Sequence, residues 1–174
     1  MPVNTNEFTT EIDVVQDDLL SYRGDGILVP TVSDCKMRSG IAARVKRAAG
    51  VAVERDAMEH VPLAVGAALV TDGGKMNVDY IIHTPIMEQP GMRVGVENIR
   101  RATRAGLLAA AHYQLDSLGI PGMGYGENGV PHDEAARAII DEVRAYKGKG
   151  PSHVTLLDRS GDMHEAFITE LGEG

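Results

Sequence analysis

Residues 119–140 read GIPGMGYGENGVPHDEAARAII: an apolar run, a glycine-rich loop and then a helical pattern. Within the loop, Gly124–Gly129 has the form G-x-G-x-x-G, which is best known from dinucleotide-binding turns. Those turns keep their third glycine inside the helix, whereas Pro131 favours a helix that begins after all three glycines. We therefore interpret the loop as one that points backbone N–H groups at an anion beside a helix N-terminus. A plain turn is the alternative, and four glycines among residues 122–129 favour the anion site.

Outside this stretch, short apolar runs alternate with helical patterns along the chain. The runs are bounded by turn residues, and the helical patterns place apolar residues three or four positions apart. The expected strands are Glu11–Val15, Gly26–Pro30, Ala67–Thr71, Tyr80–Thr84 (ended by Pro85), Ser117–Pro121 and His153–Asp158. The expected helices are Ser39–Ala49, with Ser39 as its cap, Val51–Val61, Val96–Asp116, Pro131–Tyr146 and Met163–Leu171. This order predicts an α/β fold with a mainly parallel or mixed sheet and helices on both faces.

Length and composition restrict the class of protein. A chain of 174 residues favours one domain, which we place at residues 11–174 after a flexible tail, residues 1–10. The net charge of −8 argues against binding of bulk nucleic acid. One cysteine and six scattered histidines suggest no disulfide, no metal site and no metal cofactor. No apolar run is long enough for a membrane span, so we expect a cytoplasmic protein.

A second junction between a loop and a helix follows the apolar run Gly26–Pro30. There, Arg38-Ser39-Gly40-Ile41 opens a helical pattern. Ligands of α/β sheets bind outside the carboxyl ends of the strands, so we expect this junction to face the glycine loop across a cleft. Such a cleft suits a diphosphate, whose two phosphates need hydrogen-bond donors from two sides. Arg38 either adds charge to this phosphate loop or is simply exposed.

Taken in order, five segments resemble the motifs of the macro domain, an ADP-ribose-binding module. The resemblance covers Ile12 to Leu171 and implies a three-layer α-β-α macro-domain-like fold with a mixed central sheet of about six strands. The matching segments are VVQDDLLS from Val14, DGILVPTV from Asp25, RSGIAARVKRAAG from Arg38, VGAALVTDGGKMNVDYIIHT from Val65 and PGMGYGENGVPHDEAARA from Pro121.

The same resemblance implies which residues bind the ligand. Asp18 would accept a hydrogen bond from the exocyclic amine of adenine, and the amide of Leu19 would face the base. Amides of the first loop would bind the diphosphate, and the second loop would wrap the phosphates and the distal ribose. Asp158 and Arg159 fall where the family contacts adenine, with Arg159 either stacked on the base or in a surface salt bridge. The first loop supplies Ser39, Gly40 and Ile41, and the second supplies Gly124, Tyr125, Gly126, Glu127, Asn128 and Gly129.

Two departures from the family pattern concern the distal ribose and hydrolysis. Val32 stands where many members have an asparagine that orders this ribose, and Ala42 replaces an acidic residue. The leading hypothesis is therefore binding of ADP-ribose or a related adenine diphosphate, with weak or no hydrolase activity and no cofactor. The alternative is an ADP-ribosyl hydrolase or O-acetyl-ADP-ribose deacetylase that acts on ADP-ribosylated protein or nucleic acid. A third class is a partner-binding domain whose pocket has decayed.

Two further side chains have a chemical and a structural interpretation. Cys35 would be either a nucleophile or a small packing residue, and packing is the commoner role. His132, at a helix start, would be either a base or a neighbour of Asp133 and Glu134, whose charges suit the helix dipole. The structural interpretation is favoured for both.

Overall fold

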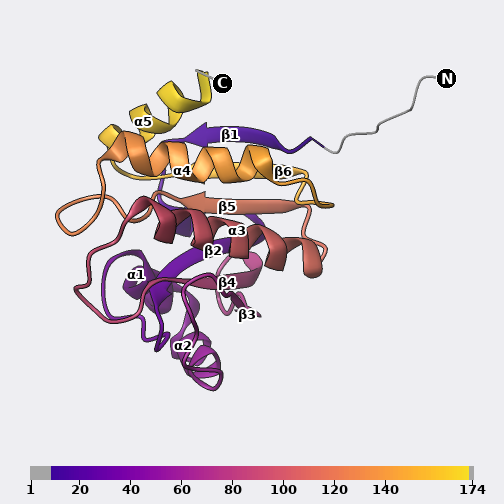
Figure 1. The fold of residues 1–174 in the computed structure, drawn as a ribbon. Helices are drawn as coiled ribbons and strands as arrows, with labels where there is room; N and C mark the ends of the chain where they lie inside the picture. The colour runs from indigo at the N-terminus through magenta and orange to yellow at the C-terminus, as the bar shows by residue number, and fades with distance from the viewer. Residues whose placement is uncertain (1–8, 173–174) are drawn as a thin grey trace.

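The computed structural model describes residues 9–172 and consists of a six-stranded sheet between two sets of helices (Figure 1). The strand order is β1-β6-β5-β2-β4-β3. Within the described residues, β3 and β4 run antiparallel and the other neighbours run parallel, which confirms the mixed sheet. The strands are β1 (Glu11–Val15), β2 (Gly24–Val32), β3 (Leu69–Asp72), β4 (Val78–Met87), β5 (Ser117–Pro121) and β6 (His153–Leu157). The predicted tail falls mostly outside the described residues.

Each face of the sheet has its own core. Ile27 and Val29 pack toward one set of helices, and Leu28 packs toward the other. At the crossing of β2 and the long helix, Gly106 lies against Leu28 where a side chain would overlap it. One face carries α3 (Val96–His112), α4 (His132–Ala145) and α5 (Gly161–Gly172); the other carries the 3-10 helix η1 (Leu19–Ser21), α1 (Gly40–Ala49) and α2 (Val51–Met58). Since the middle of β2 is buried from both sides, its segment Gly26–Pro30 is a continuous apolar run without alternation.

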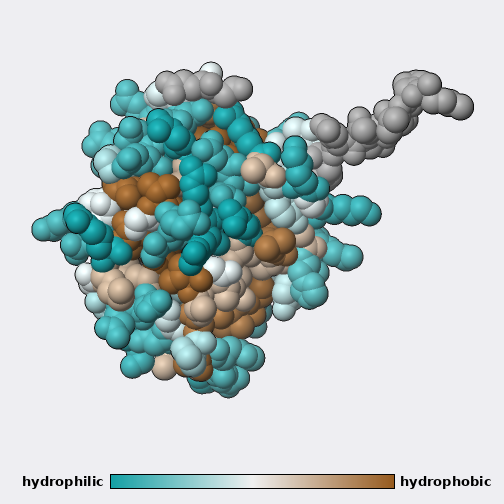
Figure 2. Space-filling model, in the orientation of Figure 1, coloured by the Kyte–Doolittle hydropathy of each residue, from teal (hydrophilic) through white to brown (hydrophobic). Residues whose placement is uncertain are grey.

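The outer surface of the α3–α4 layer is held by ion pairs. Glu142, of which the side chain is 10% exposed, accepts from Arg104 at 2.9 Å, and Asp141 accepts from Arg100 at 3.3 Å. In Figure 2 this face is mainly hydrophilic over α4 and α5. None of the described helices is long and apolar enough to cross a membrane.

The prediction that Pro85 ends its strand is wrong, because β4 continues through it to Met87. The edge strand β3 pairs with β4 only as far as His83, so beyond that point β4 has one neighbour in the sheet. A proline is tolerated in such a stretch because one side of the strand requires no ladder hydrogen bond.

Other boundaries also differ from the predicted ones. The second helix ends at Met58 rather than Val61, since a residue before proline disfavours the helical conformation. The third ends at His112 because Gln114 has a φ of 58°, which reverses the chain. Ser39 does occupy the cap position of α1, but its side chain makes no capping hydrogen bond.

Buried His83 generates a prediction about acid stability. Its Nε2 lies 2.9 Å from Thr71 Oγ1, and burial lowers the pKa of the imidazole to about 4. The unfolded chain therefore takes up a proton first, and stability falls as the pH drops from the unfolded pKa of about 6.5 toward 4. The full effect is about 3 kcal/mol. NMR titration should show no protonation of His83 above pH 5, and His83→Gln should reduce the loss of unfolding free energy between pH 7 and 5. Titration of His83 near pH 6.5 would contradict this.

Candidate ligand-binding cleft

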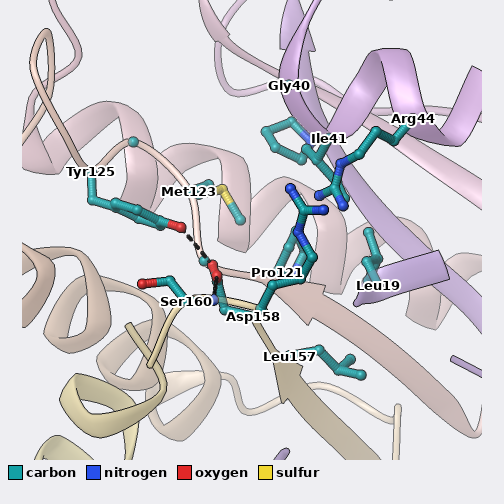
Figure 3. A pocket seen from close by; sticks show the side chains of 14 residues that line it. Leu19, Gly40, Ile41, Arg44, Pro121, Met123, Tyr125, Leu157, Asp158 and Ser160 are labelled. Carbon is teal, nitrogen blue, oxygen red and sulfur yellow. Dashed lines mark hydrogen bonds between the residues drawn. The ribbon is translucent and has the colours of Figure 1, made fainter. Parts of the chain in front are cut away.

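A cleft of about 620 Å³ opens at the carboxyl ends of the central strands, as expected for an α/β sheet. Its floor contains Pro30 near the end of β2, Pro121 at the end of β5 and Leu157 at the end of β6. Figure 3 shows α1 on one side of the cleft and the loop after β5 on the other. The remaining lining residues are Leu19, Gly40, Ile41, Arg44, Gly122, Met123, Gly124, Tyr125, Asp158, Arg159 and Ser160.

The first loop is anchored from α2. The backbone N–H of Met37 donates to Glu54 Oε2 at 2.7 Å, and Lys46 lies 2.8 Å from the other oxygen of this carboxylate. Burial opposes ionisation of Glu54, but these two donors outweigh it and lower the pKa of the carboxyl. The Met37 side chain is itself buried. The hydrogen bond to Glu54 and the burial of the Met37 side chain both fix the backbone that leads into α1.

The first backbone N–H groups of α1 have no hydrogen-bond acceptor within the helix. The first intrahelical hydrogen bond is donated by Ala43 to Ser39 O, so the N–H groups of Gly40, Ile41 and Ala42 lie ahead of it. Ser39 makes no side-chain cap, and the first turn of α1 contains no acidic residue. These donors carry the partial positive charge of a helix N-terminus and are suited to an anion.

The second loop is held in shape by its own backbone. Val130 N donates to Gly124 O at 2.9 Å, and Gly129 N donates to Gly126 O at 3.1 Å. From outside the loop, Val94 N donates to Asn128 O at 2.8 Å. Within the part of the chain that the structure describes, the amides of Tyr125, Glu127 and Asn128 have no protein acceptor. The loop is therefore rigid and keeps free donors.

A hydrogen bond ties this loop to the end of β6. Tyr125 donates its phenolic proton to Asp158 Oδ2 at 2.9 Å (Figure 3), and Ser160 N donates to the other oxygen at 2.8 Å. Burial, and then the charge of Asp158, raise the pKa of the Tyr125 phenol. The tyrosine ring also lies 4.6 Å from the ring of His132. Asp158 thus has a donor on each oxygen, and its contact with Tyr125 joins two walls of the cleft.

Asp18, which precedes the cleft residue Leu19, is also engaged. Its Oδ1 accepts from Leu20 N at 3.2 Å, which caps η1, and its Oδ2 accepts from Arg44 Nη1 at 2.7 Å. Arg159 Nη1 lies 3.9 Å from the same Oδ2. Arg44 is absent from the predicted site, although a sequence signal for it exists: it follows Ile41 by three positions and so shares its helix face.

A smaller cavity of about 250 Å³ lies on the other side of the first loop. The two cavities share Pro30, Gly40 and Ile41. Val32 and Ala42 line the smaller one, and no Asp, Glu, Asn or Gln is among its described lining residues. Its cations are Lys36 and Arg38, and Arg38 is paired with Asp34.

The structure brings most of the predicted site residues together. Those lining the larger cleft are Leu19, Gly40, Ile41, Gly124, Tyr125, Asp158 and Arg159; Val32, Ser39, Gly40 and Ile41 line the smaller cavity. Asp18 reaches the cleft through its contact with Arg44. The second loop is completed by Gly126, Glu127, Asn128 and Gly129. All of these except Gly129 are exposed.

Cys35 and His132, for which the sequence also allows a catalytic role, lie in different environments. Cys35 is fully buried, and burial raises the pKa of its thiol to about 11, which disfavours the nucleophilic thiolate. His132 begins α4 and contacts the Tyr125 ring. Among the described residues, no group of three His, Cys, Asp or Glu side chains is placed to hold a metal ion.

Comparison with known proteins assigns the family. The sequence matches the family described as "Macro domain" over residues 30–139. An uncharacterized protein of Aquifex aeolicus is 39% identical over 162 residues, which make up 93% of this chain and 98% of the relative. The chain belongs to the macro domain family.

Solved structures agree with this assignment. A mutant of the Oceanobacillus iheyensis macrodomain with ADPR has a TM-score of 0.84 at 20% identity, and the match covers 97% of this chain and 95% of that one. The Trypanosoma brucei macrodomain in complex with ADP-ribose has a TM-score of 0.80 at 21% identity, and the match covers 94% of this chain and 69% of that one. At these identities the likeness concerns the fold, and it confirms the predicted macro-domain-like architecture.

The second loop generates a prediction about close packing. A side chain at Gly129 would overlap the backbone carbonyl of Gly124, which cannot yield without moving the loop. Gly129→Ala should therefore lower the free energy of unfolding by about 2 kcal/mol in denaturant melts. The matched control is Gly172→Ala at the open end of α5, where an added methyl group meets nothing. Equal stability of the two variants would refute the close packing.

Proposed function

We propose that the cleft binds ADP-ribose or a related adenine diphosphate, with weak or no hydrolysis. The observation that carries this proposal is the start of α1, where unpaired N–H groups line a cleft opposite a second loop with free amides. A diphosphate has acceptor oxygens on both of its phosphates, so it can accept from both sides at once. The ligands named for the O. iheyensis and T. brucei macrodomains support the same chemistry.

The proposed orientation follows the walls of the cleft. The base lies toward Leu19 and Asp18, and the diphosphate lies between the start of α1 and Gly124–Tyr125. The group beyond the diphosphate then enters the smaller cavity beside Val32, which adjoins the cleft.

Weak or absent hydrolysis follows from the side chains beside the distal group. Val32 and Ala42 can neither orient nor deprotonate a water molecule. The nearest carboxylate on the first loop, Asp34, is paired with Arg38, which lowers the pKa of this carboxyl. Asp158 is similarly engaged with Tyr125. Without these carboxylates, hydrolysis would depend on substrate groups and loop amides to position the water.

Calorimetric titration tests the binding proposal. ADP-ribose should bind with micromolar affinity, which corresponds to about 8 kcal/mol, and more tightly than ribose 5-phosphate. ATP and NAD serve as further nucleotide controls. Absence of heat at millimolar ADP-ribose would refute the proposal.

A second assay tests hydrolysis. Incubation with ADP-ribosylated protein should release little free ADP-ribose above a buffer blank; rapid release would instead establish the hydrolase alternative.

A variant of Asp18 tests the orientation. Asp18→Ala should weaken the binding of ADP-ribose by about tenfold, since it removes the charged acceptor of a hydrogen bond donated by the base amine. Ribose 5-phosphate, which has no base, should not be weakened. The control is Asp56→Ala on the exposed side of α2. Equal losses for ADP-ribose and ribose 5-phosphate would contradict the placement of adenine at Asp18.

A further inference from the structure

Arg44 lines the described cleft but belongs to neither loop. It lies on α1 one turn after the unpaired N–H groups of Gly40 and Ile41, and its side chain is 21% exposed. Figure 3 shows it extending from α1 into the cleft. Instead of facing solvent, its guanidinium is paired with Asp18 at 2.7 Å. A cation therefore lies next to the proposed phosphate site but is held at the proposed base site.

This pairing has a consequence for Asp18. Each carboxylate oxygen already has a donor, Leu20 N on one and Arg44 Nη1 on the other. A base amine at Oδ2 would therefore have to share this oxygen with Arg44, a charged and stronger donor. Breaking an ion pair between partly exposed groups costs little, provided that both charges find new partners.

New partners are available on both sides. Arg44 can donate to a phosphate oxygen at the start of α1, and guanidinium groups form strong charge-assisted hydrogen bonds with phosphates. Arg159 Nη1 lies 3.9 Å from Asp18 Oδ2 on a side chain that is 62% exposed, so it can approach and keep the carboxylate compensated. An oxygen with two lone pairs can accept from both Arg159 and an amine.

We propose that Arg44 is a specificity-determining residue that exchanges partners, pairing with Asp18 before ligand binds and with the diphosphate afterwards. This inference rests on the proposed function, because it takes the diphosphate as the ligand group. The exchange links the two ends of the cleft: a phosphate that draws Arg44 away frees Asp18 for the base. Molecules that carry both a base amine and a diphosphate are then favoured over either half alone.

Titration of separate ligand halves tests this exchange. Wild type, Arg44→Met and Asp18→Asn are each titrated with pyrophosphate, adenosine and ADP. Methionine keeps much of the length of arginine without its charge. Arg44→Met should weaken the binding of pyrophosphate and ADP by about tenfold or more, because one charge-assisted hydrogen bond is lost. The binding of adenosine should not be weakened.

Asp18→Asn provides the second, independent variant. It releases Arg44 without removing it, so pyrophosphate should bind a few-fold more tightly, and the double variant should lose this gain. Arg55→Met on α2, where the arginine is 72% exposed, is the matched control. A pyrophosphate affinity of Arg44→Met within twofold of wild type, or no gain in Asp18→Asn, would overturn the exchange and leave ADP-ribose binding intact. Failure of wild type to bind ADP-ribose would overturn the exchange and the proposed function together.

Discussion

The unpaired backbone N–H groups at the start of α1 are the constraint on which the site depends. A helix cannot satisfy these donors internally, and here neither Ser39 nor an acidic side chain does so. The surrounding structure keeps them in place: β2 directs the chain to the cleft, and Glu54 fixes the approach to α1 through Met37. A loop with its own free amides then completes the opposite wall.

Local donors reconcile the proposed anion site with the acidic composition of the chain. The chain has a net charge of −8, yet among the described residues the charged side chains that line the cleft, or are paired with one that does, are two arginines and two aspartates. Asp18 and Asp158 are both engaged with protein donors, so their repulsion of a phosphate is reduced. Backbone dipoles and Arg44 then decide the local field. Specific recognition of a small anionic ligand is thereby compatible with a net negative charge.

The sequence could predict the fold and the position of the cleft, because both depend on local signals. Pro131 placed the start of α4 after the glycine loop, and apolar runs identified β2 and β5. The predicted end of a strand at Pro85 was wrong, because β4 tolerates a proline only where β3 no longer pairs with it. How far β3 extends is a tertiary property that local sequence does not show.

The side-chain network of the site was harder to predict for the same reason. Asp158 and Tyr125 are 33 positions apart, and Asp18 and Arg44 are 26 apart. No local pattern in the sequence indicates that these pairs meet. Sequence matching could assign Asp18 and Asp158 to the ligand, but only the fold shows that each already has a protein partner.

The most direct test of this site is to locate the bound phosphates. The chemical shifts of the backbone amides can be followed residue by residue in ¹⁵N–¹H NMR spectra during titration with ADP-ribose. We expect the amide signals of Gly40, Ile41 and Ala42 and those of the loop from Gly124 to Asn128 to shift with a single affinity. Shifts confined to one of these loops, or to the smaller cavity around Val32, would contradict a diphosphate held between the two.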